Sequence, residues 1–159
     1  MILISTYESL WGYFCRKIQS ISRHFVVADV DEMQEIASDL ADGEVVLIAV
    51  IPSSDIETSN FDDIEEIDTC WVFVLKKSDP SSMTREELSR HRNVTQQIIT
   101  DVKKEILRLT SDYAVENNYT RLLHGLVPGR MHTDPEYNFL GCNGWSLSFA
   151  IKTKGVDNA

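Results

Sequence analysis

The segment Thr84–Tyr113 constrains the fold more than any other stretch, because it has the pattern of one long amphipathic helix. Its apolar residues recur at steps of three, four or six and form one stripe, while charged residues occupy the other sides. The stripe consists of Leu88, Val94, Ile98, Val102, Ile106, Leu109 and Tyr113, widened by Ile99 and Leu107. Thr84 and Glu87 have the spacing of a capping box, which places the helix start. Strand-like segments precede and follow it, so the pattern predicts a long helix lying across a sheet.

Four segments have the pattern of principal strands. Val45–Ile51 is an unbroken apolar run, and Thr69–Lys77 is apolar on both alternating sides, so both are expected inside a sheet that is covered on both faces. They are expected to pair antiparallel, because no crossover helix is predicted between them. Met131–Leu140 and Trp145–Lys152 lie on either side of an Asn-Gly turn. The short apolar run His24–Val27 fits an edge strand.

Two shorter helices are predicted near the start of the chain. Ser5–Ile21 carries an apolar stripe at helical spacing. Asp29 is placed to cap a second helix, and Gly43 is placed to end it. Residues 119–125 fit either a helical turn or a short extended run.

The order of these elements predicts a single α+β domain over residues 1–159. It has an N-terminal helix within 1–22, and a tail at 154–159 that is expected to be frayed. The sheet is expected to be mostly antiparallel, with about four strands and with the helices packed on one face.

The composition limits the classes of partner. The formal net charge is −10, and a nucleic-acid-binding protein usually carries a basic field, so direct nucleic-acid binding is not expected. The three cysteines are far apart and odd in number, which favours reduced thiols in a cytoplasmic protein. Charged residues follow the apolar start too closely for a signal peptide, and no apolar run is long enough to cross a membrane.

The segment 53–68 is rich in acidic residues and has no basic one, and we expect a polar loop or a β-excursion there. Its oxygen-bearing side chains fit several positions of an EF-hand loop counted from Asp55. Asn60 stands where that loop requires glycine, and the flanks have strand patterns, so a calcium site is not predicted. We expect no metal and no cofactor.

Two sets of residues are candidates for a protein interface. Trp11 and Phe14 lie on the N-terminal helix, where they either join the core or form an exposed patch against a neighbouring subunit. The second set consists of the carboxylates of the acidic segment, namely Asp55, Glu57, Asp62, Asp63, Glu65 and Glu66.

Enzymatic chemistry has little support in the sequence. The chain has no P-loop, dinucleotide-binding or serine-hydrolase motif, so we expect no enzymatic activity. A metal-dependent enzyme would have to use His124, His132, Asp134 and Glu136, whose spacing matches no metal motif. Cys70 is expected to be a packing residue, and Cys142 an exposed residue of a turn.

The second half of the chain resembles a known family. A strand Cys70–Lys77, a long amphipathic helix and a hairpin ending with Gly144–Phe149 follow one another, as they do in small prophage-encoded tail-terminator or tail-completion proteins of tailed phages. These proteins join the tail tube to the head. The upstream run His24–Val27, the Asp-capped helix and the strand Val45–Ile51 follow the same order, so the resemblance spans about residues 25–153.

The resemblance implies an α+β subunit that forms a homo-oligomeric ring, binds other phage structural proteins and catalyses no reaction. It places the protein in the host-cell cytoplasm or in the virion, and it implies no particular functional residues. In a ring, the acidic segment 55–68 would line the lumen or the rim. The alternative hypothesis is an acidic binding or inhibitor-type module, in which the same segment recognises a basic protein partner.

Overall fold

The computed structural model describes residues 1–60, 63–79, 81–112 and 117–154. The chain forms α1 (Ile4–Lys17), β1 (Arg23–Val27), α2 (Val30–Asp39), β2 (Val45–Asn60), β3 (Asp63–Lys77), α3 (Arg85–Ser111), α4 (Asn118–Leu123), β4 (Leu126–Phe139) and β5 (Cys142–Lys154). The predicted α+β class is confirmed. Of the predicted frayed tail, Lys154 ends β5, and residues 155–159 lie outside the described part.

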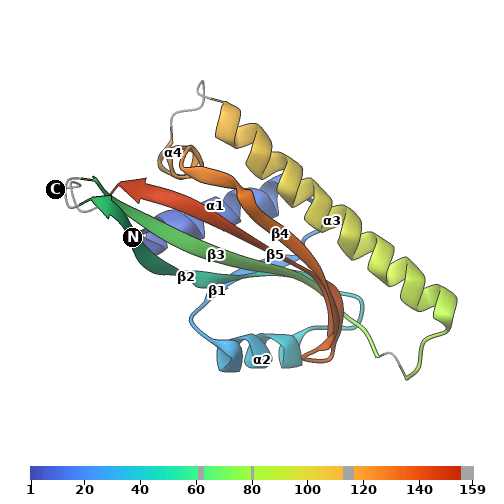
Figure 1. Ribbon diagram of the computed structural model, residues 1–159. Helices are drawn as coiled ribbons and strands as arrows, with labels where there is room; N and C mark the ends of the chain where they lie inside the picture. Colours follow the sequence, from blue (N-terminus) through green and yellow to red (C-terminus); the bar gives the residue numbers. More distant parts are fainter. Residues whose placement is uncertain (61–62, 80, 113–116, 155–159) are drawn as a thin grey trace.

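The strands form one sheet in the order β1-β2-β3-β5-β4 (Figure 1). β1 runs parallel to β2, and all other neighbours are antiparallel. The sheet is therefore mixed and has five strands, which corrects the prediction of about four. The additional strand is the short run considered as an edge strand, and it can run parallel because α2 carries the chain back between β1 and β2.

The helices cover both faces of the sheet, which corrects the prediction that they pack on one. α1, α3 and α4 share a large core with one face, called here the helix-covered face. α2 packs on the other face in a smaller core, through Met33 and Ala37 against Val46 and Ile48. Figure 1 shows α3 and α4 above the strands and α2 below them. Strands that are apolar on both sides need this double cover, because either face left open would expose apolar surface to water.

The long helix α3 starts where the capping box predicted. The Thr84 hydroxyl accepts a hydrogen bond from the backbone N–H of Glu87, and the Glu87 carboxylate accepts one from the backbone N–H of Thr84. Most of the predicted stripe is buried, including Ile98, Val102 and Ile106. Val94 and Leu107, at the margins of the stripe, are exposed instead.

The acidic segment is a β-hairpin, so the β-excursion was the correct alternative. β2 continues past Val50, where its pairing with β1 ends, and β5 ends at Lys154 opposite Glu65. Residues 51–60 and 63–68, called here the arm, therefore lie beyond the end of β1. Glu65–Asp68 still pair with β5, and the described arm residues beyond Glu65 pair only within the arm. Figure 1 shows the ends of β2 and β3 at the left end of the sheet, next to the end of β5.

Candidate interaction surface

The face of the sheet opposite α1 and α3 carries a row of side chains that crosses all five strands. The strand pairings place Val27, Val50, Trp71, Ser148 and His132 beside one another in this row. α2 covers one end of it, so Val27 is buried. Trp71 lies on the central strand, and 42% of its surface is exposed. We call this side of the sheet, beyond the cover of α2, the open face.

The exposure of Trp71 follows from the alternation along β5. Its large side chains, Leu147 and Phe149, are buried on the helix-covered face. The intervening positions, Ser146 and Ser148, face the other way and are too small to cover an indole ring. The open face thus combines a large aromatic residue with small neighbours, a surface that a partner can cover.

Charged groups border the open face along β4. The imidazole Nε2 of His132 lies 3.0 Å from a carboxylate oxygen of Asp134. The hydroxyl of Ser146 donates a hydrogen bond of 2.7 Å to the carboxylate of Glu136. His124 is elsewhere, at the C-terminal end of α4. The described residues contain no group of three or more His, Cys, Asp or Glu side chains that could hold a metal ion.

Several arm carboxylates have cationic partners within the chain. Arg130 of β4 lies 2.8 Å from Glu57, and Lys152 of β5 lies 2.5 Å from Glu65. Asp55 is exposed. The four side chains of the Arg130–Glu57 and Lys152–Glu65 pairs are about half exposed, so each pair contributes little to stability. The pairs do lower the charge that the arm presents to a partner.

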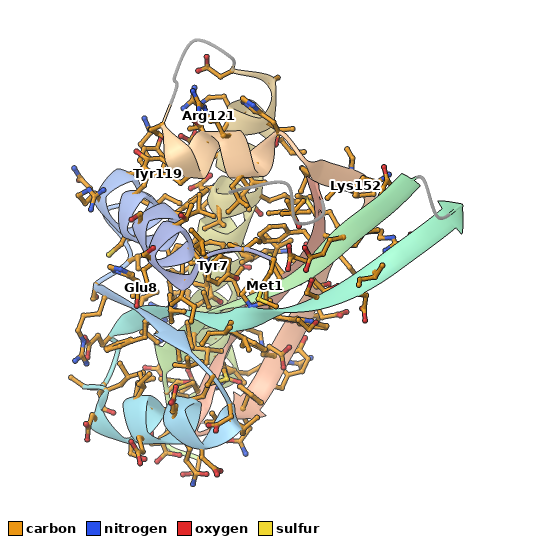
Figure 2. The ribbon with its side chains drawn as sticks, turned by 90° about the vertical axis from the view of Figure 1, so that its left-hand side faces the viewer. Met1, Tyr7, Glu8, Tyr119, Arg121 and Lys152 are labelled. Atoms are coloured by element: carbon orange, nitrogen blue, oxygen red, sulfur yellow. The ribbon has the colours of Figure 1, made fainter. Side chains whose placement is uncertain are left out.

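Glu66 lies at the base of the arm, where it contacts the start of the chain. Its carboxylate accepts hydrogen bonds from the α-ammonium group of Met1 and from the hydroxyl of Ser54. These two bonds hold the pKa of Glu66 below its usual value. The buried carboxylate of Asp68 accepts a 2.7 Å hydrogen bond from Thr153 and lies 3.6 Å from the same ammonium group. Figure 2 shows Met1 against the strands at this point.

The remaining acidic candidates are Asp62 and Asp63. Asp62 lies outside the described residues, and the backbone of Asp63 starts β3 while its side chain is outside the described part.

Trp11 and Phe14 belong to the core and form no surface patch, which corrects their selection as interface candidates. Neither side chain is exposed. Their ring centroids are 5.3 Å apart, and the ring centroids of Trp11 and Phe149 of β5 are 6.3 Å apart. The apolar stripe of α1 faces the sheet, so its large aromatic residues were the ones to be buried.

α1 has a different apolar surface, which the sequence analysis missed. Leu3 occupies the N-cap position without a side-chain capping bond, and Ile4 starts the helix; they are 72% and 51% exposed. The sequence pattern could have indicated this surface, because both residues precede the apolar stripe of α1. Two consecutive exposed aliphatic side chains are a candidate contact surface.

The three cysteines are free thiols. Cys142 is buried rather than exposed, which corrects the prediction from its turn, and burial raises its pKa. Burial raises the pKa of Cys70 far above its usual value. Both thiols are therefore poor nucleophiles.

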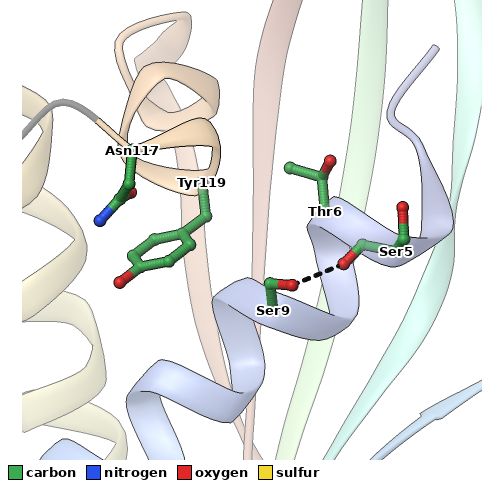
Figure 3. Close-up of a pocket in the computed structure, with 5 residues that line it drawn as sticks. All are labelled: Ser5, Thr6, Ser9, Asn117 and Tyr119. Atoms are coloured by element: carbon green, nitrogen blue, oxygen red, sulfur yellow. Dashed lines mark hydrogen bonds between the residues drawn. The ribbon is translucent and has the colours of Figure 1, made fainter.

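A shallow hollow of about 450 Å³ lies between α1 and α4 (Figure 3). Ser5, Thr6, Ser9, Asn117 and Tyr119 line it. The Ser9 hydroxyl donates to the backbone carbonyl of Ser5, and the Asn117 side chain accepts from the backbone N–H of Thr120. These side chains can form hydrogen bonds, but they include no strong acid or base.

None of the described helices combines the length and the apolar character needed to cross a bilayer. The chain matches no protein-family model and no curated protein.

Proposed function

We propose that this chain is a non-enzymatic structural subunit that works as a closed homo-oligomer, of the kind that completes the tail or neck of a tailed phage. The projecting arm carries the proposal. Beyond Val50, the described strands provide no partner for the outer side of β2, and beyond Glu65 the arm has only two strands.

An arm of this kind favours contact with another chain. A two-stranded hairpin is at best marginally stable in water without further packing. Its open edge also offers backbone donors and acceptors to a neighbour. Ile56 lies on the arm with 69% of its surface exposed, so the arm has an apolar side chain to bury. A neighbouring copy would supply both the packing and the cover.

The order of the elements also supports the proposal. From β1 onward the chain runs through α2, β2, β3, α3, α4 and the β4–β5 hairpin. Apart from the short helix α4, this is the order on which the resemblance to tail-terminator proteins rests. In the assembled state the arm would lie at the lumen or the rim of a ring, next to other phage structural proteins.

The acidic-module alternative has less support. Glu57, Glu65 and Glu66 each contact a cationic group of the same chain, so less of the arm's charge is available to a basic partner.

The proposal is tested by the mass of the native protein in light scattering over a wide range of concentrations. We expect a single closed oligomer whose mass does not grow with concentration. In a shortened variant, Asn-Gly replaces residues 57–65 and joins Ile56 to Glu66, which are cross-strand partners. We expect this variant to keep its circular dichroism spectrum. Its native mass should fall well below that of the parent oligomer, because the subunits no longer assemble.

A matched control keeps both the length and the charges of the arm, as Ser53→Thr at an exposed position near its start. We expect it to assemble like the parent protein. A parent protein that stays monomeric at every concentration contradicts the proposal, and so does a shortened variant that assembles normally.

A further inference from the structure

We propose that the subunits join head to tail, with Leu3 and Ile4 at the start of α1 of one copy docked on the open face around Trp71 of the next. This inference rests on the proposed function, because it specifies the contact between the subunits.

The first observation is that the two surfaces are apolar and lie on different sides of the molecule. Trp71 is on the open face, whereas α1 packs on the helix-covered face. In Figure 2, α1, marked by Tyr7 and Glu8, and α2 lie on opposite sides of the first strands. Surfaces on different sides cannot meet within one copy, but each can meet the other surface of a second copy.

The second observation is the separation of charge between the two sides. The three helices of the helix-covered face, α1, α3 and α4, together contain nine basic and five acidic residues. On the other side, α2 contains four acidic residues and no basic one. The same side carries Asp134 and Glu136 on β4, the arm carboxylates Asp55, Glu57 and Glu65, and Glu44. Its described cations include Arg23, Lys77, Arg130 and Lys152, so acidic residues still predominate there.

This charge separation decides which copy-to-copy contact is favourable. A symmetric contact of the open face with itself would bring two acidic sides together, which costs free energy. A contact between the open face and the side that carries α1 brings opposite charges together. The structure therefore favours a heterologous contact between different surfaces, and heterologous contacts form a ring when the rotation between subunits closes.

Disulfide trapping tests the contact directly. The double variant Leu3→Cys with Ser148→Cys places one new thiol at each surface of the full chain. After mild oxidation we expect covalent dimers and higher multimers, because each copy links to the next on both sides. Each single variant, and the parent protein with its native Cys15, Cys70 and Cys142, should give none.

Two results of the trapping experiment would overturn the inference. Covalent dimers from Ser148→Cys alone would show that the open face meets itself, which overturns the inference. The same holds if the parent protein assembles and the double variant forms no covalent multimers.

A second measurement uses surface substitutions. We expect Trp71→Ser, and separately Leu3→Ser with Ile4→Ser, to raise the protein concentration needed for half-assembly at least tenfold. Val94→Ser is the matched control, since Val94 on α3 is also 42% exposed but lies on neither surface. Ser148→Glu adds bulk and charge beside Trp71 and should also raise the concentration needed for half-assembly. This variant tests the contact if Trp71→Ser does not fold.

The failure of this inference is distinguishable from the failure of the proposed function. A parent protein that stays monomeric contradicts both. A parent protein that assembles while Trp71→Ser and Ser148→Glu assemble equally well contradicts only the head-to-tail contact.

Discussion

Trp71 and Ser148 are cross-strand neighbours on β3 and β5, and Ser148 leaves the indole of Trp71 open to solvent. The next pair of the same two strands, Val72 and Leu147, is fully buried on the other face. One pair of strands therefore contributes both to the core and to the surface that we assign to subunit contact.

The three tryptophans should differ in their access to a small quencher. Trp11 is buried, Trp145 is half-buried and Trp71 is exposed. We expect Trp71→Phe to remove most of the emission that acrylamide quenches in dilute protein. Because the site is on the surface, the free energy of unfolding should change by no more than about 0.5 kcal/mol. Unchanged quenching in this variant would contradict the described position of Trp71.

Trp11 should show the opposite behaviour. Trp11→Ala removes a large buried ring from the contact between α1 and β5, and a cavity remains. We expect the free energy of unfolding in urea to fall by about 3–5 kcal/mol. Trp71→Ala, measured in the same way on dilute protein, serves as the comparison. Equal losses for both variants would mean that Trp11 is not in the core.

Gly144 should tolerate no side chain. A Cβ atom at this position would lie 1.9 Å from the backbone carbonyl oxygen of Val74 on the neighbouring strand. The strands would have to separate, so we expect Gly144→Ala to cost at least about 2 kcal/mol of unfolding free energy. Gly129→Ala is the control, since no atom lies within 4 Å of its added Cβ. Similar stability of the two variants would contradict the described packing of β3 and β5.

The junction of α1 and α3 should lose stability in acid. Arg108 donates two hydrogen bonds of 2.9 Å to the carboxylate of Glu105, and Tyr13 of α1 donates another. The bonds from Arg108 are the main cause that lowers the pKa of Glu105. A lowered pKa means that the stabilisation is complete above the pKa of the unfolded chain, about 4.3, and is lost as the pH falls through the lower pKa of the folded state.

We therefore expect Glu105→Gln to be less stable than the parent protein at pH 7, by about 1 kcal/mol or less because Arg108 is half exposed. The difference should shrink as the pH falls below about 4. Urea unfolding at a series of pH values measures it, with Glu86→Gln on the exposed side of α3 as the control. A difference that does not depend on pH would exclude this ion pair as the cause.

Local chemistry explains what the sequence alone could predict. The capping box of Thr84 and Glu87 and the cap at Asp29 act between residues three apart, so the starts of α3 and α2 were predictable. The apolar run of β2 and the alternation of β5 depend on side chains of the same strand, and both strands were found. The acidic segment was left open between loop and strand, because its pairing partner is another part of the same segment.

The tertiary structure decided everything that depends on distant neighbours. Trp11 and Trp71 both occur in apolar patterns, yet one is buried and the other exposed. The difference is that Phe149 packs beside Trp11, whereas the cross-strand neighbours of Trp71 are the smaller Val50 and Ser148, and the cover of α2 ends before it reaches Trp71. Likewise β1 became a parallel fifth strand only because α2 crosses to the other face. The sequence by itself determined the helices and strands through local periodicity and capping, while burial and the interaction surface were set by which elements lie on each face of the sheet.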